Sequence, residues 1–119
     1  MIIELLGFVA PPDKQTDLYQ ALFSSLGPTR VTPGCLECRL YHDADANTHY
    51  LESRWSTEDD LIRHVRSDAY KRLLLLMELG AQAPSIEFFN LSKMRGLDFI
   101  KAARQRQAIS TLSCLPPTF

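Results

Sequence analysis

Apolar positions along the chain predict an alternation of strands and helices. Ile2 to Val9 is apolar except at two positions, which is typical of a strand buried on most of both faces. The pattern then predicts a helix that starts near Asp13, a possible N-cap, and stops at Gly27 and Pro28. Its apolar face consists of residues at helical spacing, namely Leu18, Tyr19, Leu22, Phe23 and Leu26.

Two alternating runs, Cys35 to His42 and Thr48 to Trp55, predict a β-hairpin around the turn-forming residues DADAN at positions 43–47. One antiparallel register makes every opposed pair favourable, whereas a slip by one residue would turn the apolar set to the wrong side. On one side of the sheet this register pairs Arg39 with Glu52, Glu37 with Arg54 and Tyr41 with Tyr50. On the other side it pairs Leu40 with Leu51, Cys38 with Ser53 and Leu36 with Trp55.

Two helical runs follow the hairpin. Ser56 or Thr57 can cap the first run, and an aspartate further along completes a capping box. Ser67 can cap a second run that ends at Gly80. We therefore expect this helix to bend or divide near Arg66.

The last regular segments are a strand and a short helix. Pro84 opens a strand in which Ile86 and Phe88 alternate with their neighbours. Residues 96–105 predict a short extra helix, and we expect the tail after Ile109 to be mobile or to reach across a partner. The chain therefore divides into a domain at residues 1–94 and a C-terminal helix and tail at residues 95–119.

The predicted order of the main elements is β-α-β-β-α-β. This order is typical of an α+β, ferredoxin-like fold, in which a four-stranded antiparallel sheet carries both helices on one face. The opposite face of the hairpin mixes aromatic residues with complementary charges, which suits a surface that meets another sheet. We therefore predict a homodimer built sheet against sheet. The residues expected at this interface are Arg39, Tyr41, Tyr50, Glu52 and Arg54.

Composition excludes several classes of function. A length of 119 residues fits one domain, and a net charge of -1 from scattered charges provides no basic face for nucleic acid. The N-terminus lacks the features of a signal peptide, and no apolar run reaches the length of a membrane span. We therefore expect a soluble, cytoplasmic protein that binds neither nucleic acid nor membrane.

Cys35 and Cys38 form a Cys-x-x-Cys motif, which in other proteins indicates redox chemistry or a zinc site. Because side chains alternate along a strand, an offset of three should turn the two sulfurs to opposite sides of the sheet. His42 and His49 do not complete a recognised ligand spacing with them. We therefore predict no metal site.

The predicted layout offers one place for a small ligand. Trp55 ends its strand beneath the second helix, and His64 on that helix can approach it across the gap between helix and sheet. A cavity there would be mainly apolar, as small-molecule sites are. Its other walls would be Leu6 or Phe8, Phe23 and Met77. The alternative is that Trp55 and His64 are ordinary core residues.

Several segments together resemble a known family. They are the run Arg30 to Leu36 (RVTPGCL), the hairpin that ends in Trp55-Ser56, the segment Glu58 to His64 that leads to Ser67, and Tyr70. As a set, these segments resemble the antibiotic biosynthesis monooxygenase family over roughly residues 2–94. The resemblance implies a dimeric α+β barrel with a site between helices and sheet.

Enzymes of this family include quinol-type monooxygenases that oxidise phenols with molecular oxygen and without metal or flavin. The resemblance thus implies a cofactor-independent enzyme that positions and deprotonates a small phenol or quinol. It implies that Trp55 contacts the aromatic ring and that His64 acts as base or hydrogen-bond donor. It also implies that Tyr70 and Arg66 stabilise the anion. Leu51 would line the pocket where some members have an asparagine, without a hydrogen bond to the substrate.

Two other functions stay open. The pocket could hold a small aromatic or fatty ligand without turnover, since no second polar residue is assured of facing it. Haem degradation is disfavoured, because the haem-degrading branch has an asparagine on its first strand and this strand offers only Glu4 as a polar side chain.

Overall fold

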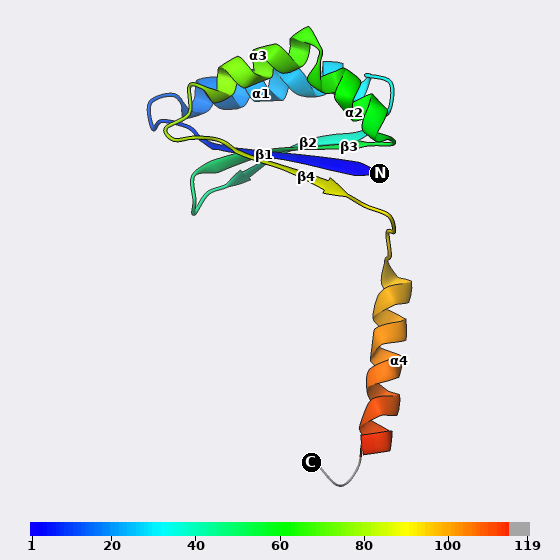
Figure 1. The fold of residues 1–119 in the computed structure, drawn as a ribbon. Coiled ribbons are helices and arrows are strands. Elements are labelled where there is room, and N and C mark those ends of the chain that lie inside the picture. Colours follow the sequence, from blue (N-terminus) through cyan, green and yellow to red (C-terminus); the bar gives the residue numbers. More distant parts are fainter. Residues whose placement is uncertain (115–119) are drawn as a thin grey trace.

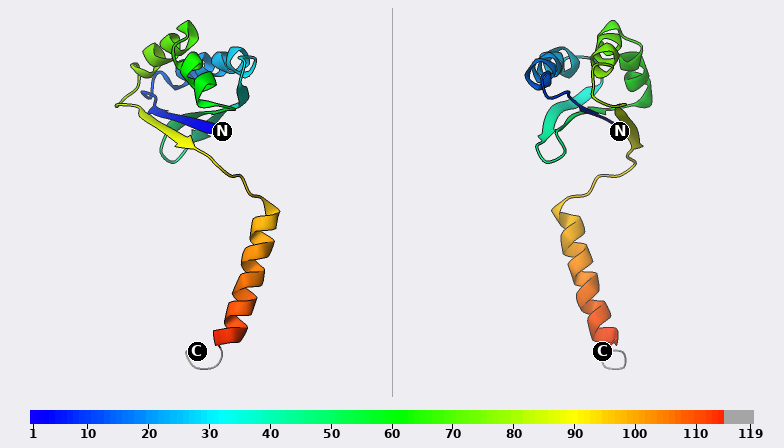
Figure 2. Two further views of the ribbon diagram at one scale, coloured as in Figure 1. Left: turned by 45° about the vertical axis from the view of Figure 1, so that its right-hand side comes forward. Right: turned by 90° about the vertical axis from the view of Figure 1, so that its left-hand side faces the viewer.

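The computed structural model describes residues 1–114, with side chains as far as residue 105. In chain order the elements are β1 (Ile2–Val9), α1 (Gln15–Arg30), β2 (Cys35–Asp43), β3 (Thr48–Trp55), α2 (Glu58–Val65), α3 (Asp68–Met77), β4 (Ser85–Asn90) and α4 (Leu97–Cys114). The four strands form an antiparallel sheet in the order β2-β3-β1-β4. Helices α1, α2 and α3 cover one face of this sheet, and the other face carries no helix in Figures 1 and 2. The predicted ferredoxin-like α+β fold is therefore confirmed.

Strand β1 organises the core because it lies between β3 and β4 and its side chains alternate between the two faces of the sheet. Its even-numbered residues point toward the helices and are buried, while its odd-numbered apolar residues on the other face are partly exposed. Leu6 and Phe8 pack with Leu22 of α1 and with Leu73 and Met77 of α3 in one apolar cluster. This packing fixes the distance between the helical layer and the sheet.

The hairpin has the predicted register except at its first pair. A β-bulge between Cys35 and Glu37 places Cys35, not Leu36, opposite Trp55. Leu36 is consequently turned outward and is 57% exposed, so its predicted place on the helix side was wrong. The bulge follows a tight turn in which Gly34 adopts a φ of 87° and leaves no room for a Cβ beside Asp60.

The same bulge corrects the prediction for the Cys-x-x-Cys motif. Alternation holds only along an unbroken ladder, and one inserted residue reverses the facing of everything before it. Cys35 and Cys38 therefore both lie on the helix side, where each packs against the apolar core. Both are free thiols.

Helix α1 continues through Gly27 and Pro28, where the sequence predicted its end. Pro28 cannot donate a hydrogen bond to the carbonyl group of Ser24. Both residues are exposed, so water can donate this hydrogen bond instead. One hydrogen bond within the helix and one to β2 hold the last turn. Thr29 is buried and donates to the Ser25 carbonyl group at 2.8 Å, while Arg30 Nε donates to the Cys38 carbonyl group of β2 at 2.9 Å.

The division between α2 and α3 is as predicted. Thr57 caps α2 by accepting from the Asp60 backbone N–H at 3.2 Å, and Ser67 caps α3 by accepting from the Tyr70 N–H at 3.2 Å. Arg66 stands at the break between the two helices. The two caps are the local reason that α2 and α3 point in different directions over the sheet.

Helix α4 is longer than the short helix predicted at residues 96–105. It begins at Leu97 and continues to Cys114, so the tail expected after Ile109 begins in regular helix. Figures 1 and 2 show that it projects away from the rest of the chain, on the side of the sheet opposite α1, α2 and α3. Residues 115–119 of that expected tail lie outside the described residues. Within residues 1–114, no helix is long and apolar enough to cross a membrane.

Candidate active site

Trp55 and His64 meet between the sheet and α2, as the sequence predicted. Trp55 is the last residue of β3 and is completely buried, while His64 lies in the last turn of α2 and is 6% exposed. The indole and imidazole rings are stacked, with centroids 4.5 Å apart and planes inclined by 26°. Tyr70 of α3 approaches the same imidazole edge-on, at a centroid distance of 5.2 Å.

A hydrogen-bonded chain runs beneath this stack and ends on a buried carboxylate. Trp55 Nε1 donates to Ser53 Oγ at 2.9 Å, and Ser53 Oγ donates to Glu4 Oε1 at 3.3 Å. The Tyr70 hydroxyl donates to Glu4 Oε2 at 2.9 Å. Glu4 is only 1% exposed, and no salt bridge is found to it within the described side chains. The carboxylate thus accepts hydrogen bonds from hydroxyl groups of β3 and α3. Through Ser53 it links Trp55 to Tyr70.

Burial is the main cause of the shifted pKa values of Glu4, Tyr70 and His64. Desolvation raises the pKa of Glu4, and the hydrogen bonds from Tyr70 and Ser53 only partly oppose it. The pKa of Tyr70 is raised by burial and then by the Glu4 carboxylate, so the phenol stays protonated. Burial lowers the pKa of His64. At neutral pH the imidazole is therefore uncharged and able to accept a proton.

His64 also lines a groove between α1 and α3. The groove encloses about 440 Å³, and its walls are mostly apolar. Among the side chains that the structure describes, the ionisable residues of its lining are His64 and Arg72 of α3, and Arg72 is exposed. The groove therefore brings one neutral base and one fixed cation to a surface where an aromatic ring could bind.

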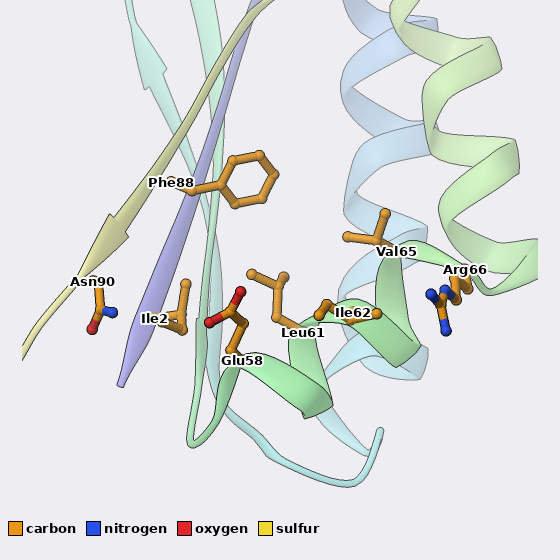
Figure 3. A pocket seen from close by; sticks show the side chains of 8 residues that line it. All are labelled: Ile2, Glu58, Leu61, Ile62, Val65, Arg66, Phe88 and Asn90. Atoms are coloured by element: carbon orange, nitrogen blue, oxygen red, sulfur yellow. The ribbon is translucent and has the colours of Figure 1, made fainter.

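A second cleft of about 390 Å³ lies on the other side of α2, beside β1 and β4 (Figure 3). Figure 3 shows Phe88 of β4 projecting into the gap toward α2, with Ile2 of β1 and Leu61 of α2 below its ring in this view. Ile2 and Leu61 pack directly on Trp55, so the indole is screened from this cleft. The cleft is lined by Ile2, Glu58, Leu61, Ile62, Val65, Arg66, Phe88 and Asn90.

The structure does not bring all the predicted site residues together. Tyr70 lies against His64, and Arg66 lies on the second cleft instead. Phe23, expected in the cavity wall, is 59% exposed and stacks on Tyr19. It occupies the outer side of α1, because the buried stripe of this helix passes through its neighbour Leu22. The remaining predicted residues, Leu6, Phe8, Leu51 and Met77, are packed in the main core.

Sequence reasoning missed Glu4 and Ser53 as members of the site. Glu4 carried a signal, since an acidic residue inside an apolar strand must find hydrogen-bond donors when it is buried. Ser53 carried none, because its role depends on the pairing of β1 with β3, which places it directly opposite Glu4.

An antiparallel sheet with helices on one face, and a Trp–His stack above a buried carboxylate between the two layers, define a ferredoxin-like α+β protein with an internal polar site. Residues 1–74 match the antibiotic biosynthesis monooxygenase family. The chain belongs to this family. None of the curated proteins matches it.

Solved structures share the fold at low sequence identity. Rv0793 from Mycobacterium tuberculosis is 23% identical with a TM-score of 0.73, and the likeness covers 80% of this chain and 98% of Rv0793. PA3566 from Pseudomonas aeruginosa is 22% identical with a TM-score of 0.67, covering 77% of this chain and 94% of that one. An antibiotic biosynthesis monooxygenase is 17% identical with a TM-score of 0.69, covering 78% of this chain and 100% of that one.

Proposed function

We propose that this protein is a cofactor-independent monooxygenase that oxidises a small phenolic or quinol-type substrate with molecular oxygen. The observation that carries the proposal is the placement of His64. It is a neutral base, stacked on Trp55, on the wall of an apolar groove that also contains Arg72. Family membership supports the reaction class.

In this proposal the groove binds the aromatic ring and His64 removes the phenolic proton. The phenolate is stabilised by the Arg72 guanidinium and is electron-rich enough to reduce oxygen itself. Oxidation of a phenol to a quinone places one oxygen atom on the ring and releases the other as water, with all electrons supplied by the substrate. The protein positions, deprotonates and shields the ring, and the network from Glu4 to Trp55 holds His64 in place.

Oxygen uptake with a panel of hydroquinones and polycyclic phenols tests this function. We expect wild-type turnover to increase with pH as His64 loses its proton and then to level off. His64→Gln should lower the rate by a factor of about 10²–10⁴, which is typical for loss of a general base. Arg72→Ala should also lower it, whereas Arg63→Ala, an exposed arginine on α2, should not. Uptake that is absent from the wild type, or equal in His64→Gln, would exclude this mechanism.

A second candidate function is binding without turnover. The cleft in Figure 3 favours it, because this cleft is predominantly apolar and its ionisable residues, Glu58 and Arg66, include no neutral base. A small aromatic or fatty ligand that raises the melting temperature without oxygen uptake would identify this function.

We also propose that two copies pair through the sheet face that carries no helix. On this face Glu37 forms ion pairs with Arg39 and Arg54, and Arg54 also pairs with Glu52 at 3.6 Å. Tyr41 is exposed beside them. Charges already paired within one subunit can be covered by another at a smaller desolvation cost than isolated charges.

Tyr50→Asp tests this pairing. Tyr50 lies on this face in the inner strand β3, where its ring passes over Gly7 at a distance that leaves no room for a Cβ. A carboxylate buried there without a cation should shift the protein toward monomer in sedimentation experiments. The matched control is Tyr19→Asp on α1, on the opposite side of the molecule, which should leave the dimer intact. Equal behaviour of the two variants would exclude this face.

A further inference from the structure

His42 and His49 form a pair of imidazoles outside the site described above. They are directly opposed in the β2–β3 register, close to the hairpin turn and on the helix side of the sheet. Their ring centroids are 4.6 Å apart, and the two Nδ1 atoms are separated by 3.2 Å. Two nitrogen atoms therefore face each other with room for one shared proton or one ion.

The surroundings hold one ring in place and leave the other accessible. His49 is 3% exposed, and its ring is packed between Phe8, at a centroid distance of 5.7 Å, and Tyr19, at 5.8 Å. His42 is exposed to solvent. Burial, followed by the neighbouring His42, lowers the pKa of His49, so its imidazole is in the neutral form that binds metals.

We propose that His42 and His49 form a binding site for a divalent transition-metal ion that prefers imidazole, such as Zn²⁺ or Ni²⁺, with Nδ1 of each ring as ligand. Two imidazole nitrogens bound tetrahedrally at about 2.0–2.1 Å from one ion lie about 3.3 Å apart, close to the separation found here. Imidazole is a preferred ligand of these ions. The ion would replace the proton shared between the rings.

The site has two protein ligands and is open on the side of His42. Among the residues whose side chains the structure describes, no third histidine, cysteine or carboxylate completes a metal-binding group. The nearest acidic residue in sequence, Asp43, accepts hydrogen bonds from the Asp45 and Ala46 backbone N–H groups. Water would therefore fill the other positions of the ion, which predicts exchangeable binding rather than a permanent structural metal.

Calorimetric titration of the full chain with Zn²⁺ or Ni²⁺ near pH 7.5 tests the site. We expect about one ion per chain, and at least about tenfold weaker binding in His42→Ala, because loss of one of two ligands leaves a single imidazole. His42 is exposed, so this variant should fold. His64→Gln removes the remaining histidine of the chain and should bind as the wild type does.

Co²⁺ absorption identifies the ligands independently of affinity. Imidazole ligation should shift and strengthen the weak visible bands of hydrated Co²⁺ without a near-ultraviolet band, and His42→Ala should return the spectrum to that of the free ion. Equal affinity in His42→Ala and the wild type, no binding by the wild type, or a strong near-ultraviolet band from cysteine sulfur would each overturn the proposal. None of these outcomes depends on whether the protein oxidises phenols.

Discussion

Replacement of Trp55 by alanine should lower the free energy of unfolding by about 3–5 kcal/mol. The indole is completely buried, packs on Ile2 and Leu61, and stacks on His64. Its removal leaves a cavity lined by residues of β1, β2 and α2, which are held in place by other contacts, so the site cannot collapse fully. Urea denaturation followed by far-ultraviolet circular dichroism measures the change, since the variant has no tryptophan fluorescence.

Trp55→Phe separates packing from hydrogen bonding. The phenyl ring fills most of the space but cannot donate to Ser53 Oγ, as Trp55 Nε1 does at 2.9 Å. We expect a loss of about 1–2 kcal/mol for this variant. A loss below about 1 kcal/mol for Trp55→Ala would mean that the indole is not part of the packed core.

Tyr70→Phe should destabilise the protein by about 1.5–3 kcal/mol at pH 8, because it removes a hydrogen bond to a buried carboxylate. The loss should be smaller at pH 4. Glu4 has a raised pKa in the folded state, mainly through burial, so the fold favours the neutral carboxyl group over the ionised one. The stability that this preference supplies is fully present below the unfolded pKa, near 4.5, and is lost as pH rises through the folded pKa.

The Tyr70 hydroxyl opposes this loss, because its hydrogen bond lowers the pKa of Glu4. Without it the folded pKa rises further, and the ionised carboxylate destabilises the fold more strongly above neutral pH. Unfolding free energies of Tyr70→Phe and the wild type from pH 4 to pH 8 check this sign. In a Glu4→Gln background the effect of Tyr70→Phe should become independent of pH. A pH-independent effect in the native background would show that Glu4 is not the partner that titrates.

The parts of the fold that were predicted from sequence are those with local causes. The caps at Thr57 and Ser67 identify themselves by residue type and spacing, and the division at Arg66 follows from them. The hairpin register follows from cross-strand pairs that are all set by side-chain alternation. In contrast, the bulge before Glu37 lies in the pairing of β2 with β3, and the end of α1 forms a hydrogen bond to β2. The spacing of apolar residues reveals neither contact.

The candidate site also has parts that were predicted from sequence and parts that were not. The meeting of Trp55 and His64 was predicted, because both face the same gap by strand and helix geometry. The carboxylate of Glu4 was not assigned to the site. Its hydrogen-bond donors come from β3 and α3, and they meet at Glu4 only when β1 pairs with β3 and α3 packs on the sheet. The groove with Arg72 could not be predicted from the sequence either, because it is formed by the spacing of α1 and α3.

The single inserted residue near the start of β2 has a consequence for thiol chemistry. It turns two sulfur atoms inward together but to different depths, since Cys35 is partly exposed and Cys38 is buried with a pKa raised by burial to about 12. Only the thiolate attacks an alkylating reagent, so Cys38 is protected for as long as the hairpin stays docked beneath the helices. The rate at which Cys38 is alkylated therefore reports how often the hairpin separates from the helices.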